Sequence, residues 1–347
     1  MRRAVVAALV VLLVAGQPQP ALAYLKFGVT IGGNQVTLKW AQAPVRYSVS
    51  TQSAPQVSVA DFQDAVARAF NTWQSVPSAT VTYQFAGLTS ALPGRDDGLS
   101  VLGFQSRPDL DRVLAATSFL IDRTTGALVE SDIFFNTAFD WSVSPAGTAT
   151  RFDLESIALH EIGHLSGLGH SALGETELRD GGRRVLAAEA VMFPIAFASG
   201  SIAGRTLKAD DIAGITDLYP EADSTRTSGS ISGRVTKDNQ PVFGAHIVAF
   251  SVARGTSVGT FSLGAQGQFS VAALQPGVYI LRTEPLDDAD LDSFFDNTRT
   301  VDLDFRVAFA DRVVVVPRGG DSGEIAVKVV RKCGASRDSR PAWRPCR

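Results

Sequence analysis

The apolar positions along the chain follow two periods. Between Asp61 and Trp73 they recur every three or four residues, as on the buried face of a helix. Ser58, with Asp61 three residues after it, is typical of a helix start. We therefore predict an amphipathic helix here, with an apolar face made by Phe62, Ala65, Val66, Ala69, Phe70 and Trp73.

Shorter runs that alternate, or are rich in β-branched residues, predict strands on both sides of this helix. They are 45–49, 81–85, 99–104, 113–121 and 132–136. A second helix should begin after Asp153, a residue favoured at N-caps, and a third should run from near Thr206 to just before Pro220. This order predicts an α+β fold, with a twisted mixed sheet and three main helices.

The pattern changes beyond Pro220. Residues 221–229 are polar, without a hydrophobic period, and predict a linker. From residue 230 to 332, short β-rich segments alternate with turns built from Gly, Pro, Asn and Asp. Examples are 230–235, 246–250, 268–271, 278–281, 313–316 and 325–329. Such spacing predicts a small all-β sandwich as a second domain.

The N-terminus points to export. Residues 1–23 combine two arginines, an apolar run at 4–15 and small residues before position 24, which is the organisation of a secretory signal. The apolar run is too short to span a bilayer well, and we find no later membrane-spanning run. We therefore expect a secreted protein, either periplasmic or extracellular.

Charge and cysteine content add less. The net charge is −3 with acids and bases intermixed, which predicts no nucleic-acid partner. The two cysteines, Cys333 and Cys346, fall in a basic tail, 333–347. In an exported protein they could form a disulfide, and free or intermolecular thiols are the alternative. The tail is either a solvated end or a contact with the cell envelope or matrix.

One stretch carries most of the chemistry. Residues 160–170 read H-E-x-x-H-x-x-G-x-x-H and contain three of the four histidines in the chain. On a helix, His160 and His164 would project from one face. Gly167 can adopt a positive φ, which ends the helix and lets the chain return with His170 as a third ligand. Three protein ligands leave the fourth position of a tetrahedral zinc open to water, as in catalytic sites.

Two further residues complete the predicted site. Glu161 follows the first ligand and can reach that water as a general base. Zinc would lower the pKa of the water towards about 7, and Glu161 would take its proton and later deliver it to the leaving amine. Met192 lies in an expected tight turn, 190–194, and would form a hydrophobic base under the metal. Outside this context a lone methionine is more often ordinary core.

These residues resemble the metzincin metalloproteases and, among them, the matrixins. The resemblance extends beyond the motif to Ser171, to the lead-in at 152–159, and to the predicted helices at 61–73 and 207–219. Because it covers roughly residues 38 to 220, we assign 24–220 to a matrixin-like catalytic domain. It implies a zinc-dependent endopeptidase that acts on polypeptide substrates.

The same resemblance implies finer features. The strand at 113–119 should be the sheet edge that pairs with an extended substrate, and the region after Met192 should wall the pocket for the residue that follows the cut. The histidines of a second, structural zinc would fall near Ala116 and Phe134, so we expect one zinc. Asn136 stands where an acidic calcium ligand is common, which leaves calcium binding open.

Two segments allow more than one interpretation. The polar insertion 175–184 borders the cleft and is either a tolerated surface loop or an element of specificity. The C-terminal region resembles carboxypeptidase regulatory-like domains at 233–235, 241–245, 267–269 and 274–279. It shows no catalytic constellation, and its His246 has no second histidine or cysteine beside it. We expect an accessory module whose removal leaves hydrolysis largely intact.

Three functions compete at this stage. The leading hypothesis is a secreted zinc endopeptidase. The alternative is a secreted binding or adhesion protein, in which the zinc domain is a scaffold and the β-sandwich carries the function. A zinc hydrolase of another substrate class is a third possibility. Glu161 discriminates between the first two, because a scaffold has no need of a general base beside its zinc.

Overall fold

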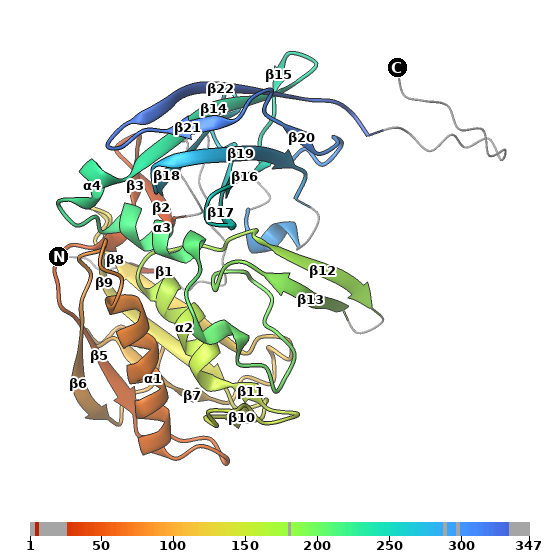
Figure 1. Cartoon of the computed structure of the whole chain (residues 1–347). Helices are drawn as coiled ribbons and strands as arrows, with labels where there is room; N and C mark the ends of the chain where they lie inside the picture. Colours follow the sequence, from red (N-terminus) through yellow and green to blue (C-terminus); the bar gives the residue numbers. More distant parts are fainter. Residues whose placement is uncertain (1–3, 7–25, 180–181, 287–289, 296–298, 333–347) are drawn as a thin grey trace.

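The structure is a computed structural model that describes residues 4–6, 26–179, 182–286, 290–295 and 299–332. Within these residues, an N-terminal α+β region and a C-terminal β region, residues 229–332, lie against each other (Figure 1). The α+β class predicted from the sequence is confirmed for the N-terminal region. Its elements are β1 (Ala4–Val6), β2 (Gly28–Ile31), β3 (Asn34–Thr37), β4 (Lys39–Trp40), β5 (Val45–Ser50), α1 (Val59–Gln74), β6 (Tyr83–Thr89), β7 (Val101–Gln105), β8 (Ala115–Ile121), β9 (Ala127–Asn136), β10 (Trp141–Ser142), β11 (Phe152–Asp153), α2 (Leu154–Leu165), β12 (Gly174–Arg179), β13 (Gly182–Ala188), η1 (Ala203–Arg205), α3 (Ala209–Leu218) and α4 (Ser224–Thr227).

The main sheet is mixed, as predicted. Its strands run in the order β1-β8-β9-β7-β5-β6, with β4 beside β9. The strands β9, β7, β5 and β6 are parallel, whereas β8 is antiparallel to β9. On its other side, β8 pairs only at Phe119–Ile121, with β1, among the described residues. Among the described residues, the first half of β8 has no paired strand on that side.

Helices α1 and α2 pack side by side against this sheet (Figure 1). Both predicted N-caps form, since the Ser58 side chain accepts from the backbone of Asp61, and the Asp153 side chain accepts from that of Ser156. Every apolar residue predicted for α1 is buried. Trp73 Nε1 also donates to Leu159 O at 2.8 Å, which ties α1 to the helix that carries the histidine motif.

The C-terminal β region contains two sheets that share a buried core. One runs β15-β14-β18 with β22 beside β14, and the other runs β17-β16-β19-β20 with β21 beside β19. The elements are β14 (Gly229–Lys237), β15 (Gln240–Pro241), β16 (His246–Ser251), β17 (Thr256–Phe261), β18 (Gln268–Leu274), β19 (Gly277–Glu284), η2 (Leu291–Ser293), β20 (Ala308–Phe309), β21 (Val314–Val316) and β22 (Asp321–Val329). The sandwich as a separate domain, and its likeness to carboxypeptidase regulatory-like domains, stay predictions.

Two segments are more ordered than the sequence suggested. The expected linker 221–229 includes α4, because its hydroxyl groups satisfy backbone carbonyls; Thr227 Oγ1, for example, donates to Asp223 O at 2.9 Å. The polar insertion 175–184 lies in an antiparallel hairpin, β12–β13, that projects from the body in Figure 1. Alternation of polar and apolar residues along the hairpin is weak, so no strand pattern was visible in the sequence.

A buried carboxylate joins the two regions. Asp210, at the start of α3, is 2 % exposed, and its Oδ1 accepts a hydrogen bond from the backbone of Gly259 in β17 at 2.7 Å. Leu173 and Ala190 of the N-terminal region pack with Val248 of β16 beside it. The largest buried cluster also contains residues of both regions. Stability of the two regions should therefore be coupled.

We expect Asp210→Asn to flatten the pH dependence of stability. Burial and, secondarily, the nearby Asp211 raise the pKa of Asp210 to about 7, against about 3.9 in an unfolded chain. Between about pH 4 and pH 7 the folded protein keeps a proton that the unfolded chain has lost, so stability falls as pH rises through this window. Asparagine does not titrate. Urea unfolding at about pH 4 and pH 7 should show a smaller fall for the variant, and parallel pH profiles would contradict the assignment.

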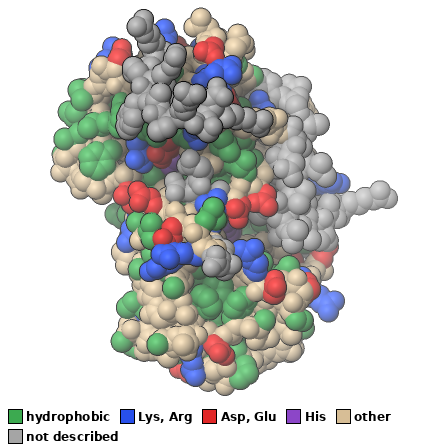
Figure 2. All heavy atoms as spheres, turned by 90° about the vertical axis from the view of Figure 1, so that its right-hand side faces the viewer, with side chains coloured by type: hydrophobic (Ala, Val, Ile, Leu, Met, Phe, Trp, Pro, Cys, Tyr) green, Lys and Arg blue, Asp and Glu red, His purple; other side chains and the backbone are tan. Residues whose placement is uncertain are grey.

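The remaining predictions for the termini lie outside the described residues. These are the expected signal segment 1–23, of which only Ala4–Val6 is described, and the basic tail 333–347 with Cys333 and Cys346. No helix among the described residues is long and apolar enough to cross a membrane. On the face shown in Figure 2, acidic and basic side chains are interspersed across the middle, in keeping with the mixed charge of the sequence.

Candidate metal centre

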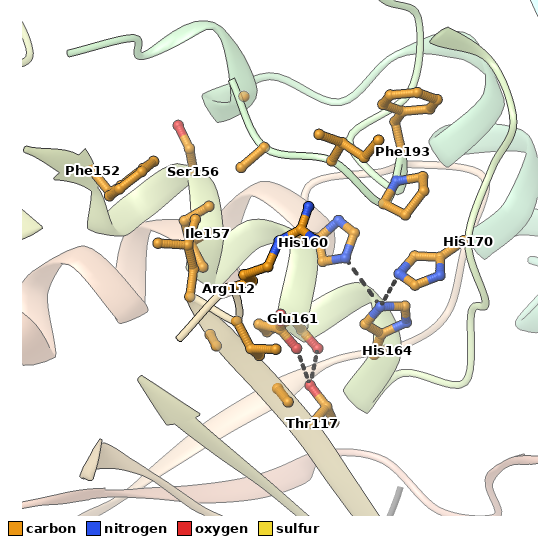
Figure 3. Close-up of a pocket in the computed structure, with 18 of the residues that line it drawn as sticks. Arg112, Thr117, Phe152, Ser156, Ile157, His160, Glu161, His164, His170 and Phe193 are labelled. Atoms are coloured by element: carbon orange, nitrogen blue, oxygen red, sulfur yellow. Dashed lines mark hydrogen bonds between the residues drawn. The ribbon is translucent and has the colours of Figure 1, made fainter. Parts of the chain in front are cut away.

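The structure brings the three motif histidines together. His160 and His164 lie on one face of α2, and the chain returns after the helix to place His170 beside them (Figure 3). Gly167 makes this return possible, because its φ is +105°. A Cβ at this position would also overlap with the backbone oxygen of Leu38. The predicted role of this glycine is therefore confirmed, with a close approach added to the turn.

Gly167→Ala is expected to lower the free energy of unfolding by about 1–3 kcal/mol, because the side chain combines a strained φ with a backbone overlap. Its matched control is Gly255→Ala, since Gly255 has a φ of +66° but no atom within 4 Å of the position that a Cβ would take. Denaturant unfolding of the metal-free proteins measures both losses. Equal losses in the two variants would show that the contact with Leu38 contributes nothing.

Each imidazole donates its Nδ1–H to a backbone carbonyl oxygen 2.6–2.8 Å away. The pairs are His160 with Val191, His164 with Leu168, and His170 with Ser293. Because a carbonyl oxygen only accepts, the hydrogen of each neutral ring sits on Nδ1, and Nε2 keeps its lone pair.

Burial lowers the pKa of His164 well below its ordinary value and that of His170 to about 3, with the nearby His160 adding to both shifts. These two rings are therefore neutral ligands at physiological pH.

The three Nε2 atoms face one another (Figure 3). His164 Nε2 lies 3.1 Å from His160 Nε2 and 3.2 Å from His170 Nε2. With the hydrogens on Nδ1, three lone pairs converge on one point. A tetrahedral ion with bonds of about 2.0–2.1 Å needs nitrogen pairs about 3.3 Å apart, so the set fits zinc. In the part of the chain that the structure describes, this is the one close group of three or more potential metal ligands.

Glu161 lies beside this centre on α2 and is 5 % exposed. Its Oε2 accepts a hydrogen bond from Thr117 Oγ1 of β8 at 2.7 Å, as Figure 3 shows. Burial raises the pKa of Glu161, while the nearby His160 and the Thr117 hydrogen bond oppose that rise. A carboxylate with a raised pKa is a stronger base, and its orientation is set from the neighbouring strand.

The methionine predicted to lie under the metal packs against α2. Met192 is 3 % exposed, and its sulfur lies so close to Gly163 of α2 that a Cβ there would overlap with it. The turn before it is held by Asp211, whose carboxylate accepts from the backbone nitrogens of Val191 and Met192 at 2.9 Å and 3.1 Å. The same turn supplies the carbonyl that orients His160. Met192 is therefore core, and the backbone around it positions a metal ligand.

A cleft of about 1050 Å³ opens over the histidines. Residues 112–118, which lead into β8 and form its first half, line one side, and residues 193–198, which follow Met192, line the other, with α2 between them (Figure 3). Arg183 of β13 and Asp290 of the C-terminal β region also line the cleft, and they form a salt bridge of 3.3 Å. Both segments that the sequence had singled out for substrate contact thus face one cleft.

Comparison with known proteins shows which family has this sequence pattern. The sequence profile of the matrixins matches residues 39–220, which is just over half of the chain. The chain belongs to the matrixin family. This matrixin is 32 % identical to Metalloendoproteinase 1 of Glycine max over 174 residues, which are 46 % of the chain and 45 % of that protein. It is 28 % identical to the hatching enzyme of Paracentrotus lividus over 216 residues, which are 54 % of the chain and 32 % of that protein.

The similarity stops short of these relatives' full length. A third relative, Matrix metalloproteinase-C of Caenorhabditis elegans, is 28 % identical over 215 residues, 59 % of the chain but 32 % of that protein. The chain thus spans less than half the length of each of these three curated relatives. Zinc as the metal of the centre agrees with the family, whereas the activity of the whole chain is a matter for proposal.

In this matrixin, the two positions expected for the histidines of a second zinc pair with each other in the sheet. Ala116 and Phe134, where structural-zinc histidines would fall, are direct partners across β8 and β9. The Asn136 Nδ2 lies 2.9–3.1 Å from three backbone carbonyl oxygens of the loop before β8, and its two N–H groups donate to this set, whereas a carboxylate has no hydrogen to donate. The side chain at position 136 is therefore committed to holding the loop at 107–113.

Several site residues were missed by sequence reasoning. Thr117 lay in the edge strand that we singled out, but nothing in its spacing tied it to Glu161. Asp211 lay in a segment that carried the resemblance to matrixins, and its partners are backbone nitrogens, which carry no residue-type signal. Ser293 contributes only a carbonyl and lies 123 positions after His170. No local motif could have revealed that contact.

Proposed function

We propose that this matrixin is a zinc-dependent endopeptidase that hydrolyses internal bonds of extended polypeptides outside the cytoplasm. The observation that carries the proposal is the buried Glu161 carboxylate, held by Thr117 beside three converging Nε2 atoms in an open cleft. Family membership supports the same conclusion. Export rests on the signal-like segment 1–23 of the sequence.

The residues of the site have different roles in the proposed reaction. Zinc held by His160, His164 and His170 would supply Lewis acidity that activates a water molecule and polarises the scissile carbonyl. Glu161 removes a proton from the attacking water and delivers it to the leaving amine. Thr117 keeps the carboxylate aimed at the cleft and prevents it from turning towards solvent. Burial of Glu161 excludes competing water molecules from the same oxygen.

The sheet edge supports an extended polypeptide as the substrate. Residues 115–118 line the cleft, and backbone pairing along them would place the substrate chain across the histidines. This edge already accepts an extended segment, because β1 pairs antiparallel with Phe119–Ile121. Residues 193–198 would then wall the pocket for the side chain that follows the cut. Arg183 of the hairpin lines the same cleft, so the insertion could contact the substrate there.

The competing functions receive less support. A zinc-bearing scaffold in a binding or adhesion protein has no use for a buried carboxylate that is hydrogen-bonded into position beside the metal ligands. A hydrolase of small molecules has no use for the open strand edge along the cleft. Contact of the C-terminal β region or the basic tail with a cell envelope or matrix is compatible with proteolysis and does not replace it.

Digestion of an unfolded protein tests the substrate class. A protein of residues 24–347 should cut the unfolded substrate into internal fragments with new N-termini, which mass spectrometry identifies. A zinc chelator should stop the formation of these fragments. The cleavage sites would then define the residue preferred after the cut. Release of single terminal residues, or fragments that form equally in the presence of the chelator, would contradict the proposal.

A further inference from the structure

The third histidine differs from the other two in the origin of its partner. The carbonyls that orient His160 and His164 belong to the N-terminal region itself. The carbonyl that orients His170 belongs to Ser293, at the end of η2 in the C-terminal β region, at 2.6 Å. This is the shortest of the three Nδ1 contacts. One metal ligand is thus held from across the boundary between the two regions.

The segment that supplies this carbonyl, residues 290–295, is anchored by its own aromatic residues. Phe294 is 7 % exposed, and its ring centroid lies 6.2 Å from that of His170 and 5.6 Å from that of Phe261 in β17. The cluster that contains Phe294 also contains Phe193, which directly follows Met192. Phe294 therefore lies beside a metal ligand and shares a buried cluster with a residue of the cleft wall.

One polar contact holds the same segment, and a second holds the strand against which it packs. Asp290 accepts from Arg183 of the hairpin β12–β13, and both residues line the cleft. Deeper in the interface, Asp210 accepts from Gly259, which fixes the strand that carries Phe261. Phe294 and the strand that it packs against therefore hold the segment with the Ser293 carbonyl beside His170.

We propose that residues 290–295 are part of the metal centre, and that the Ser293 carbonyl is the positioning group for His170. The C-terminal β region would then complete the active site rather than serve as a removable accessory. This inference rests on the proposed function in one respect: it takes zinc as the metal that the three histidines bind. A hydrogen bond that fixes the tautomer and angle of a ligating histidine typically changes metal affinity by about 10- to 100-fold.

The proposal also has a reciprocal consequence. If contact of residues 290–295 with His170 increases the affinity for zinc, bound zinc must favour that contact by the same factor. Zinc should therefore slow hydrogen exchange in the peptide that covers residues 290–295, although this peptide contributes no side chain to the metal. Exchange in that peptide should be indifferent to zinc when a histidine ligand has been removed.

Phe294→Ala in the full chain tests the proposal. Competition with a chromophoric zinc chelator should show a zinc affinity about 10- to 100-fold below that of the wild type. Phe294→Leu, which keeps an apolar anchor, should recover most of the affinity. In cobalt-substituted protein, the visible absorption should change in Phe294→Ala and not in Phe294→Leu, because the spectrum reports ligand geometry.

Two controls separate positioning from general loss of stability. Phe309→Ala removes a ring that is 60 % exposed in β20 and should change nothing. Phe269→Ala removes a ring that is 1 % exposed in the core of the same region; it should lower the melting temperature and leave zinc affinity within about twofold. If wild type and Phe294→Ala bind zinc equally, the inference fails and the proposed function stands. If the wild type binds no zinc, both fail.

Discussion

Glu161→Ala is expected to lower kcat for peptide hydrolysis by about 10²- to 10⁴-fold while the protein keeps its zinc. Among the described residues, this carboxylate is the group positioned to move the proton of the attacking water, and it contributes no atom to the group of converging metal ligands. Steady-state kinetics on a quenched-fluorescent peptide, with zinc measured on the same sample, checks both halves of the expectation.

Glu161→Gln provides the matched variant. Glutamine preserves the shape of the side chain and can still accept the Thr117 hydrogen bond, but it cannot take a proton. It should therefore be as inactive as the alanine variant. Activity close to that of the wild type in either protein would remove Glu161 from the mechanism, and it would turn attention to the scaffold alternative.

His164→Ala is expected to abolish both zinc binding and hydrolysis. His164 is the central ligand, since its Nε2 is the atom within 3.2 Å of both other histidines, and it is 7 % exposed. Its loss should weaken zinc binding by well over about 100-fold, which is the upper range for changes that only reorient a ligand. Equilibrium dialysis against buffered zinc measures the loss.

The fourth histidine is the natural control. His246 lies in β16, where its Nδ1 contacts Glu284 Oε1 at 3.1 Å, far from the motif in sequence. His246→Ala should still bind one zinc per chain at saturating zinc. If His164→Ala kept a full zinc while His246→Ala lost it, the metal centre would have to be placed elsewhere.

The features predicted best from the sequence were those with a residue-type signal. The helical period that ends at Trp73, the caps at Ser58 and Asp153, and the spacing of the motif histidines each depend on side-chain chemistry that is visible locally. The conformation at Gly167 followed from the need to bring a third ligand back to the helix. These predictions placed the metal centre on α2 without any tertiary information.

The features that were missed depend on backbone groups or on contacts distant in sequence. A carbonyl looks the same at every residue, so the bond from His170 to Ser293 left no trace in composition or period. The hairpin β12–β13 is polar, and its pairing comes from backbone hydrogen bonds rather than an apolar stripe. The sequence therefore separated the chain into a catalytic domain and an accessory module, whereas the contacts join them at the cleft.

Zinc titration of the metal-free full chain shows whether one zinc ion is sufficient for peptide hydrolysis. Peptide hydrolysis and bound zinc are followed in the same samples as zinc is added. Activity should rise in proportion to zinc occupancy and saturate at one zinc per chain. Hydrolysis before any zinc is bound, or a fully occupied centre that cuts no peptide, would contradict it.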